Sequence, residues 1–259
     1  MNDPSERKPS FWKRFGVFFL DAFIVFGVYL GLVYGAGNFA LKAATSNEIS
    51  IIQEEYQTVM VTHGYPYIQE EIFGFYQFDD LGYIKSQMEA GKTYEQAEKA
   101  ANEVSTKIDE EVTKSENYNA AFKTFFAGYN LMRAACMAIP MIIFELIIPV
   151  ATKKRQTLFM KVFRLGMAKK EDGTPIPTMR VVGRFFLIYV VEYLSLAFIS
   201  LYIGWEYIAF GFGLLASVAS MSFTRNRATI HDLLFGINVK NVDDIYTLGD
   251  PEDAVVEEQ

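Results

Sequence analysis

Long apolar runs alternate with charged stretches along the chain. The first run covers 15–41, and the second extends from about 125 to 151. Because a membrane-spanning helix needs about 20 mostly apolar residues, each run predicts one span. A third apolar region, 185–223, is long enough for two spans, with Gly204 and Trp205 at the turn between them. The pattern predicts an all-α integral membrane helical bundle with four transmembrane helices.

The charged stretches between these runs differ in sign. Residues 42–120 contain fifteen Asp or Glu and six Lys, whereas residues 152–184 contain nine Lys or Arg and two acids. Lys and Arg are concentrated in the cytoplasmic loops of membrane proteins. We therefore expect 152–184 and both termini to be cytoplasmic and 42–120 to lie outside. A three-span arrangement would place Arg225 and Arg227 outside, which favours four spans.

The segment outside the membrane has a helical pattern of its own. Apolar residues recur every three or four positions between Thr93 and Ser115, and no Pro or Gly occurs from Thr93 to Phe126. This predicts a helix that continues directly into the second span. A shorter helix around Ile52 and Tyr56 is expected to follow the first span. We therefore expect an extracytoplasmic acidic helical hairpin, with Asp79 and Asp80 in a solvated loop rather than at a metal site.

These boundaries divide the chain into four parts. They are the cytoplasmic N-terminus with the first transmembrane helix (1–41), the outer hairpin (42–121), the remaining spans with the basic loop (122–242) and an acidic cytoplasmic tail (243–259).

Asp21 lies two helical turns inside the first span. Arg14 precedes it by seven residues, so both residues fall on one helix face, about 10 Å apart along the axis. An ionisable residue within the membrane costs roughly 2.5–3.5 kcal/mol on insertion scales and usually faces the bundle interior, where it is paired. We therefore expect Asp21 to be paired with Arg14.

Two further carboxylates lie at a similar depth. Glu145 is about 9 Å from the cytoplasmic end of its span, and Glu192 is about 12 Å from Arg184. Carboxylates that meet inside a bundle can share protons or a cation, so Asp21, Glu145 and Glu192 form a candidate proton or cation site. The alternative is that each carboxylate pairs locally with Arg14, Arg184, Lys161 or a Tyr hydroxyl and only locks the bundle.

Two segments together resemble a known family. They are "RFGVFFLDAF" near the N-terminus and "RNRATIHDLLFGINV" near the C-terminus. This chain resembles the RDD family of bacterial membrane proteins, named for one arginine and two aspartates. The opening motif of that family, Arg, six residues and Asp, fits Arg14 and Asp21. Its closing motif fits His231, Asp232 and Gly236.

A middle segment of the family is kept in part. In "RQTLFMKVFRLGMAKKEDGTPIPTMRVVGRFFL" the retained residues are Thr157, Leu158, Asp172, Gly173 and Arg184. The departures are Arg155 and Phe159 in place of glycines, Met160 in place of lysine and Ile237 in place of threonine. The resemblance covers about 11–41 and 122–242, and it implies a membrane protein for which cation–proton exchange has been suggested in some relatives.

His231 and Asp232 do not indicate an enzyme, because the sequence places no nucleophile beside them and contains no hydrolase motif or phosphate-binding loop. We expect Asp232 to pair with Arg14, Arg225 or Arg227 at the cytoplasmic interface and so to close the first span on the last. The single cysteine excludes an intrachain disulfide. We expect no catalytic residue, metal site or cofactor.

Two functions remain open from the sequence. The first is a transport-related role, with proton-coupled cation movement through the intramembrane carboxylates. The second is a membrane-anchored binding or scaffold protein that presents its outer hairpin to a partner. We expect a multi-pass protein of a bacterial cytoplasmic membrane, with the lipid bilayer and protons or monovalent cations as partners and no nucleic acid. A homo-oligomer or an extracytoplasmic protein partner remains an alternative.

Overall fold

The computed structural model describes residues 9–69, 75–170, 173–189, 215–224 and 227–245. The chain divides into two compact units, which are treated separately below. Unit 1 comprises residues 1–31 and 134–259, and unit 2 comprises residues 32–133. The turn predicted at Gly204 and Trp205 lies outside the described residues.

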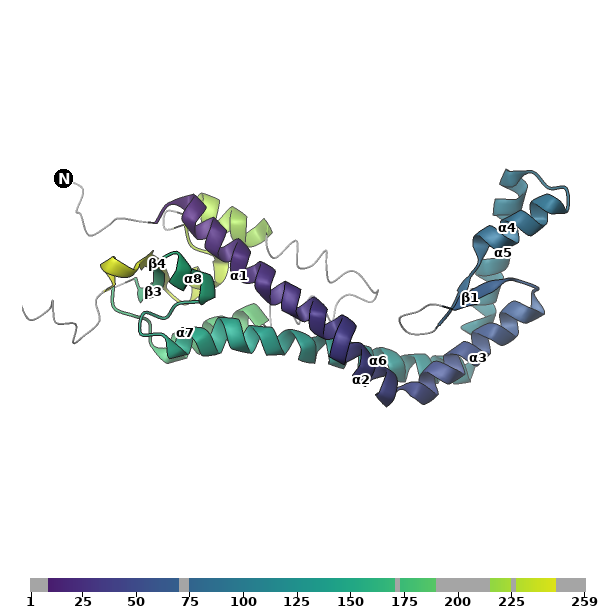
Figure 1. Ribbon diagram of the computed structural model, residues 1–259, viewed down its shortest axis with the longest axis horizontal. Coiled ribbons are helices and arrows are strands. Elements are labelled where there is room, and N and C mark those ends of the chain that lie inside the picture. The colour runs from purple at the N-terminus through teal and green to yellow at the C-terminus, as the bar shows by residue number, and fades with distance from the viewer. Residues whose placement is uncertain (1–8, 70–74, 171–172, 190–214, 225–226, 246–259) are drawn as a thin grey trace, which may run out of the picture. The chain divides into compact units, whose positions relative to one another are not determined.

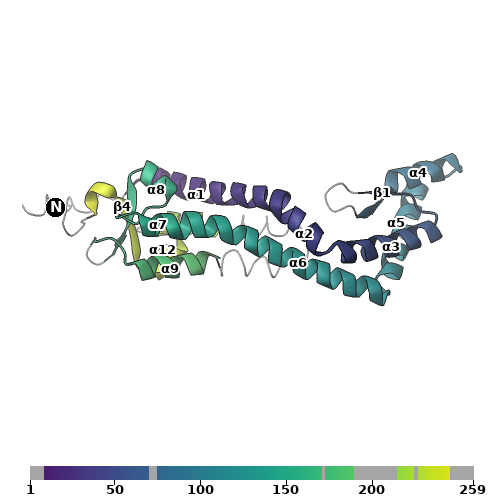
Figure 2. The same ribbon diagram turned by 60° about the horizontal axis from the view of Figure 1, so that its bottom comes forward.

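Unit 1 combines long apolar helices with a small mixed subdomain. Figures 1 and 2 show α8 and the β3–β4 ribbon near the beginning of α1. Its elements are α1 (Phe11–Leu32), the end of α6 (Glu116–Met141), the π-helix η3 (Ile142–Ile147), α7 (Ile148–Ala151), α8 (Leu158–Val162), β3 (Leu165–Lys169), α9 (Thr178–Phe186), α12 (Ile230–Leu234), β4 (Ile237–Asn241) and the 3₁₀-helix η5 (Val242–Asp244).

Two helical stretches of the described chain are long and apolar enough to cross a membrane. They are Phe11–Ala44 and Glu116–Ala151, each with a mean hydropathy of 2.2 in its most apolar window. The first passes from α1 through the π-helix η2 (Val33–Gly37) into α2 (Asn38–Ala44), with a kink at Gly35. The second contains Pro140 inside α6 and continues through η3 and α7. Both stretches contain the apolar runs that predicted the first two spans.

A two-stranded antiparallel sheet in unit 1 was not predicted. Strands β3 and β4 pair in a register that sets Met167 opposite Val239. Both of these side chains are buried and belong to an apolar cluster with Val17 of α1. Gly166 is required in β3, because a Cβ atom there would lie 2.6 Å from the carbonyl oxygen of Lys154. The chain is therefore mostly helical but not all-α.

Unit 2 is built mainly on α3 (Ser46–Thr62) and α5 (Tyr94–Val112), as the apolar spacing predicted. The stripe on α5 is buried at Ala97, Ala101, Ile108 and Val112. These residues share one core with α3 and the first part of α6. Thr93 begins α5 with a reciprocal capping box to Gln96, which satisfies two backbone groups at the helix start.

The helix predicted to run without interruption into the second span is broken. α5 ends at Val112, and α6 begins at Glu116 after a short turn. The Ser115 hydroxyl accepts from the backbone N–H of Tyr118, and the Asn119 amide donates to the carbonyl oxygens of Thr113 and Ser115. These side-chain bonds compete with helical backbone bonds, so the break needs neither Pro nor Gly.

The region between α3 and α5 also differs from the predicted loop. It contains the short antiparallel strands β1 (Tyr67–Gln69) and β2 (Tyr76–Phe78), followed by α4 (Asp80–Glu89). Asp79 is the N-cap of α4 and accepts from Gly82, while Asp80 accepts a 2.6 Å bond from the Tyr65 hydroxyl. The prediction of a loop at these two aspartates was therefore wrong, because they begin α4, whereas Asp80 is exposed to solvent as that prediction expected.

Candidate functional site

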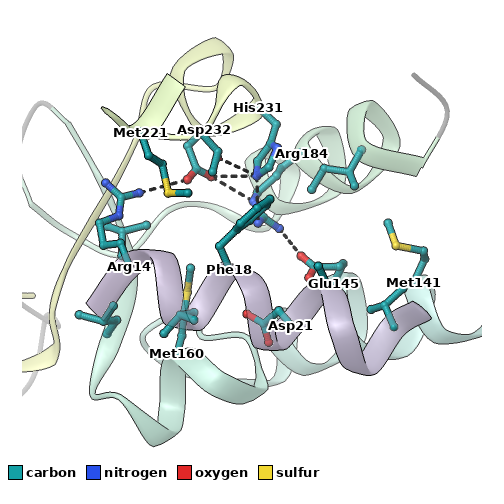
Figure 3. Close-up of a pocket in the computed structure, with 17 residues that line it drawn as sticks. Arg14, Phe18, Asp21, Met141, Glu145, Met160, Arg184, Met221, His231 and Asp232 are labelled. Carbon is teal, nitrogen blue, oxygen red and sulfur yellow. Dashed lines mark hydrogen bonds and ion pairs between the residues drawn. The ribbon is translucent and has the colours of Figure 1, made fainter. Parts of the chain in front are cut away.

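A small cavity lies in unit 1, with charged side chains set among apolar ones. It has a volume of about 60 Å³ and is lined by residues from α1, α6, α9, α12, the π-helix η3 and the strands β3 and β4, together with Met160 of α8. Figure 3 shows the charged side chains that line it, which are Arg14, Asp21, Glu145, Arg184, His231 and Asp232. A single buried water needs roughly 10–15 Å³ measured in this way. The cavity can therefore hold a few water molecules or a small ion.

Arg14 and Asp232 connect the first described helix to α12. A guanidinium nitrogen of Arg14 lies 3.4 Å from Oδ2 of Asp232, and both side chains are almost fully buried. The arginines expected as partners of Asp232 were Arg14, Arg225 or Arg227, and the contact with Arg14 is confirmed. Because the two residues are 218 positions apart in the sequence, this ion pair brings the two ends of the membrane region together.

Arg184 of α9 is the centre of the charged network. Its guanidinium group donates to Oε2 of Glu145 at 2.5 Å and to Oδ1 of Asp232 at 3.1 Å, and it lies 3.3 Å from Nε2 of His231. The dashed lines in Figure 3 follow this chain of contacts from Asp232 to Glu145. A guanidinium has no acceptor, so the contact with His231 requires Nε2 to be the acceptor and places the ring proton on Nδ1. The Thr229 hydroxyl is 2.8 Å from the same nitrogen.

Two local features position this arginine and its partners. Gly183 allows α9 to approach α12, because a Cβ atom there would lie 2.5 Å from the Phe235 ring. Glu145 lies in a π-helical segment that follows Pro140. Such segments shift the helix register locally and occur frequently at functional sites.

Asp21 has different partners from those expected. Its Oδ2 accepts a 2.5 Å bond from the Thr157 hydroxyl, and its Oδ1 accepts from the backbone N–H of Phe159 at 3.3 Å. The predicted Arg14–Asp21 pair was wrong, because Arg14 contacts Asp232 instead. The two residues are two helical turns apart, about 10 Å. Arg14 therefore reaches α12, whereas Asp21 faces α8.

Thr157 belongs to the family segment that the sequence keeps in part. It is the N-cap of α8, and its hydroxyl oxygen accepts from the backbone N–H of Met160 at 3.3 Å. The sequence indicated that this threonine is retained but did not indicate its contact with Asp21. A threonine directly before a short apolar helix is an N-cap signal, whereas its proximity to an aspartate 136 positions earlier depends on the fold.

The electrostatics around Asp232 favour its ionised form. Burial alone would raise the pKa of Asp232, but the positive charges of His231 when it is protonated, of Arg184 and of Arg14 outweigh burial and lower this pKa below the usual value. The carboxylate is therefore a fixed negative charge between two arginines. A buried charge of this kind is stable only while its partners remain in place.

The candidate proton or cation site is present in part. Asp21 and Glu145 line the same cavity, whereas Glu192 lies outside the described residues. Glu145 is paired with Arg184, as the alternative interpretation expected. For Asp21, no cationic side chain lies within ion-pair distance among the described residues, where its hydrogen-bond partners are Thr157 and Phe159.

The remaining chemistry of the described residues gives no metal centre. No group of three or more His, Cys, Asp or Glu with the geometry to hold a metal ion occurs among them. His231 is a member of the charged network through Arg184 and Thr229. Cys136 is a buried thiol.

Comparison with known families gives a match to the RDD family. The family model matches residues 8–236, which include all of unit 2, most of unit 1 and the motif residues from Arg14 to Gly236. Comparison with curated proteins and with solved structures gives no match to this chain.

Proposed function

The chain belongs to the RDD family of membrane proteins, and from this premise we propose that it is transport-related and exchanges protons for monovalent cations at Asp21 and Glu145. The site is the cavity that both carboxylates line. The proposal includes no enzymatic step and no cofactor. It also includes four spans with both termini in the cytoplasm of a bacterial plasma membrane.

The observation that carries the proposal is the charge balance of the cavity. Among the described residues that line it, two guanidinium groups face three carboxylates. When all five are ionised and His231 is neutral, one negative charge therefore has no matching positive charge. The contacts assign both arginines to Asp232 and Glu145, which leaves the extra charge on Asp21.

An unmatched charge in this position is costly. An ionisable group within a membrane span is rare and is usually paired. A single proton or one monovalent cation beside Asp21 would neutralise the cavity, and the two would compete for the same carboxylate. Competition of this kind couples the movement of one ion to that of the other, provided that the site opens to each side of the membrane in turn.

Flux through purified protein in liposomes tests this function. A vesicle with a pH-sensitive dye inside should report proton movement when NaCl or KCl is added outside. Asp21→Asn should abolish this movement, because the amide has the shape of the carboxylate but cannot hold the charge. Glu103→Gln, on the exposed surface of α5, is the matched control and should transport like the unaltered chain.

The same experiment separates transport from the scaffold role. If the unaltered chain moves no protons with either cation, the transport proposal is wrong and an anchored binding role becomes the better account. If Asp21→Asn transports as well as the control, transport occurs but the site is placed incorrectly.

Labelling of introduced cysteines tests the proposed orientation. A cysteine at Lys92 in unit 2 should react with a membrane-impermeant thiol reagent in intact cells. A cysteine at Lys169, the last residue of β3, should react only after the membrane is permeabilised. The reverse pattern would contradict the four-span arrangement.

A further inference from the structure

The hydroxyl of Thr157 contacts both its own helix and Asp21. Its oxygen accepts from the backbone N–H of Met160, and it lies 2.5 Å from Oδ2 of Asp21. A hydroxyl carries one proton, and a backbone N–H can only donate. An ionised Asp21 has no proton to donate, so the proton of Thr157 points at its Oδ2.

The second oxygen of Asp21 is also occupied by a donor. Oδ1 accepts from the backbone N–H of Phe159, in the same short segment as Thr157. An ionised carboxylate accepts at both oxygens, whereas a protonated carboxyl carries a donor on one of them. The arrangement is therefore complementary to the ionised form. Protonation removes the charge from both bonds, and hydrogen bonds to a charged group are roughly twice as strong as neutral ones.

The segment that supplies these donors also contributes one residue to the cavity lining. Met160 lines the cavity and is 6% exposed, whereas Val162, on the opposite side of α8, is 67% exposed. Figure 3 shows Met160 and Asp21 at the same side of the cavity. Moving residues 157–163 away from α1 would therefore expose the carboxylate.

Both ends of this segment are marked by unusual backbone geometry. Arg155 has φ of 51° and Arg164 has φ of 54°, so both adopt the left-handed conformation that non-glycine residues rarely take. The Arg155 side chain is anchored by bonds to the Ile176 carbonyl oxygen and the Thr178 hydroxyl. Residues at the ends of elements absorb the φ/ψ changes of hinge motions, so these two arginines stand where hinges of residues 157–163 would lie.

We propose that Thr157 is the positioning residue of the Asp21 site, and that its hydroxyl latches residues 157–163 onto α1 while Asp21 is ionised. A proton on Asp21 weakens the latch and opens the cavity on the α8 side. The inference deepens the proposed function and rests on it, since it makes occupation of the site control access to it.

The other charged groups around Asp21 do not replace the latch. Glu145 approaches from η3 and Arg184 from α9, and these two are paired with each other. Arg14, His231 and Asp232, which also line the cavity, form the network beyond them. Lys161 of α8 is exposed. The proton-dependent contact between α1 and α8 is therefore the one from Asp21 to Thr157.

Cysteine accessibility measures the latch without any transport. Met160→Cys, in a chain that also carries Cys136→Ser, should react slowly with an impermeant maleimide in lipid nanodiscs. Val162→Cys serves as the reference for intrinsic thiol reactivity, and rates are compared as the ratio of Met160→Cys to Val162→Cys. Asp21→Asn removes the charge from both bonds, as protonation does, so it should raise this ratio roughly 10- to 100-fold.

Substitutions at Thr157 test the positioning role. Thr157→Val should raise the ratio similarly, whereas Thr157→Ser, which keeps the hydroxyl, should leave it near the unaltered value. Because Thr157→Val also removes the helix cap, the decisive variant is the double change with Asp21→Asn. A latch predicts that the double variant is no more reactive than the more reactive single variant. Independent effects would multiply the two increases and overturn the inference.

A pH series tests the same contact with Asp21 and Thr157 unchanged. Lowering the pH should raise the ratio in the chain that keeps Asp21 and should have no effect in Asp21→Asn. A ratio that is independent of pH in both chains overturns the latch. If the latch results are as expected but no flux is observed, the proposed function fails alone; flux without a latch response leaves the function and removes this inference.

Discussion

Replacing Asp232 tests how the two ends of the membrane region are joined. Asp232 is 2% exposed, and its two oxygens lie 3.4 Å from Arg14 and 3.1 Å from Arg184. Asp232→Asn keeps the shape of the side chain and removes its charge. The change leaves two buried guanidinium groups facing an amide that can accept from them only weakly.

The loss of stability in Asp232→Asn depends on how many carboxylate contacts each arginine retains. Arg184 keeps Glu145 at 2.5 Å, whereas the carboxylate contact described for Arg14 is the one to Asp232. Removing one partner of a buried ion pair typically costs about 3–5 kcal/mol, and the retained Glu145 contact places this change near the lower value, about 3 kcal/mol. At about 2–4 °C per kcal/mol for a chain of this size, Tm should fall by roughly 6–12 °C.

A double-mutant cycle tests whether the stability lost in Asp232→Asn comes from its ion pair with Arg14. Thermal unfolding of the purified protein in one detergent would compare Asp232→Asn, Arg14→Gln and the double variant. The double variant should be more stable than the sum of the single losses predicts, with a coupling of about 0.5–3 kcal/mol. The matched control cycle uses Asp21→Asn with Arg14→Gln, whose losses should add within about 0.5 kcal/mol. Coupling in the control cycle, with additivity in the first, would refute the assignment of Arg14 to Asp232.

The difference in Tm between the unaltered chain and Asp232→Asn should depend on pH in a defined direction. The folded-state pKa of Asp232 lies below its usual value of 3.8, so the folded state favours the ionised form. Its stabilising contribution is therefore present above pH about 4 and is lost as the pH falls through the folded-state pKa. The gap in Tm between the unaltered chain and Asp232→Asn should be constant from pH 8 to 5 and close only in stronger acid.

Three further predictions concern packing and are measured by thermal unfolding in detergent. Gly183→Ala should destabilise the protein by about 1–3 kcal/mol, because the added Cβ meets the Phe235 ring; an unchanged Tm would show that α9 and α12 are not closely packed. Ile108→Ala should cost about 2–5 kcal/mol, since this side chain is fully buried in unit 2, and hydrogen exchange should localise the loss to that unit. Arg155→Ala should be less stable than Arg155→Gly by about 1 kcal/mol, because glycine accepts the left-handed backbone; equal stability would remove the strain argument.

The sequence predicted the helical part of the fold because periodicity is local. The stripe on α5 and the two apolar runs were found from spacing alone, and the described helices contain them. The β3–β4 pair was missed because its strands are five residues long and about 70 positions apart. Nothing in the local pattern of "LGMAK" indicates which strand it will join.

The candidate site was predicted to a similar extent. Spacing placed Asp21 and Glu145 at one depth, and the structure sets both in one cavity. The partner of Asp21 was wrong because a shared helix face says that two residues point the same way, not that they meet. The contact between Thr157 and Asp21 depends on how α8 folds back onto α1, which is a tertiary feature that spacing does not contain.

Proton release on cation binding is the most direct measurement of the central claim, that Asp21 holds either a proton or a monovalent cation. Purified protein in a weakly buffered detergent solution would receive NaCl or KCl, with choline chloride as the ionic-strength control, at several pH values between 5 and 9. The account predicts release of up to one proton per chain over part of that range. It predicts none from Asp21→Asn, and unchanged release from Glu103→Gln. Release that is the same in Asp21→Asn, or no release from the unaltered chain at any pH in that range, would contradict the account.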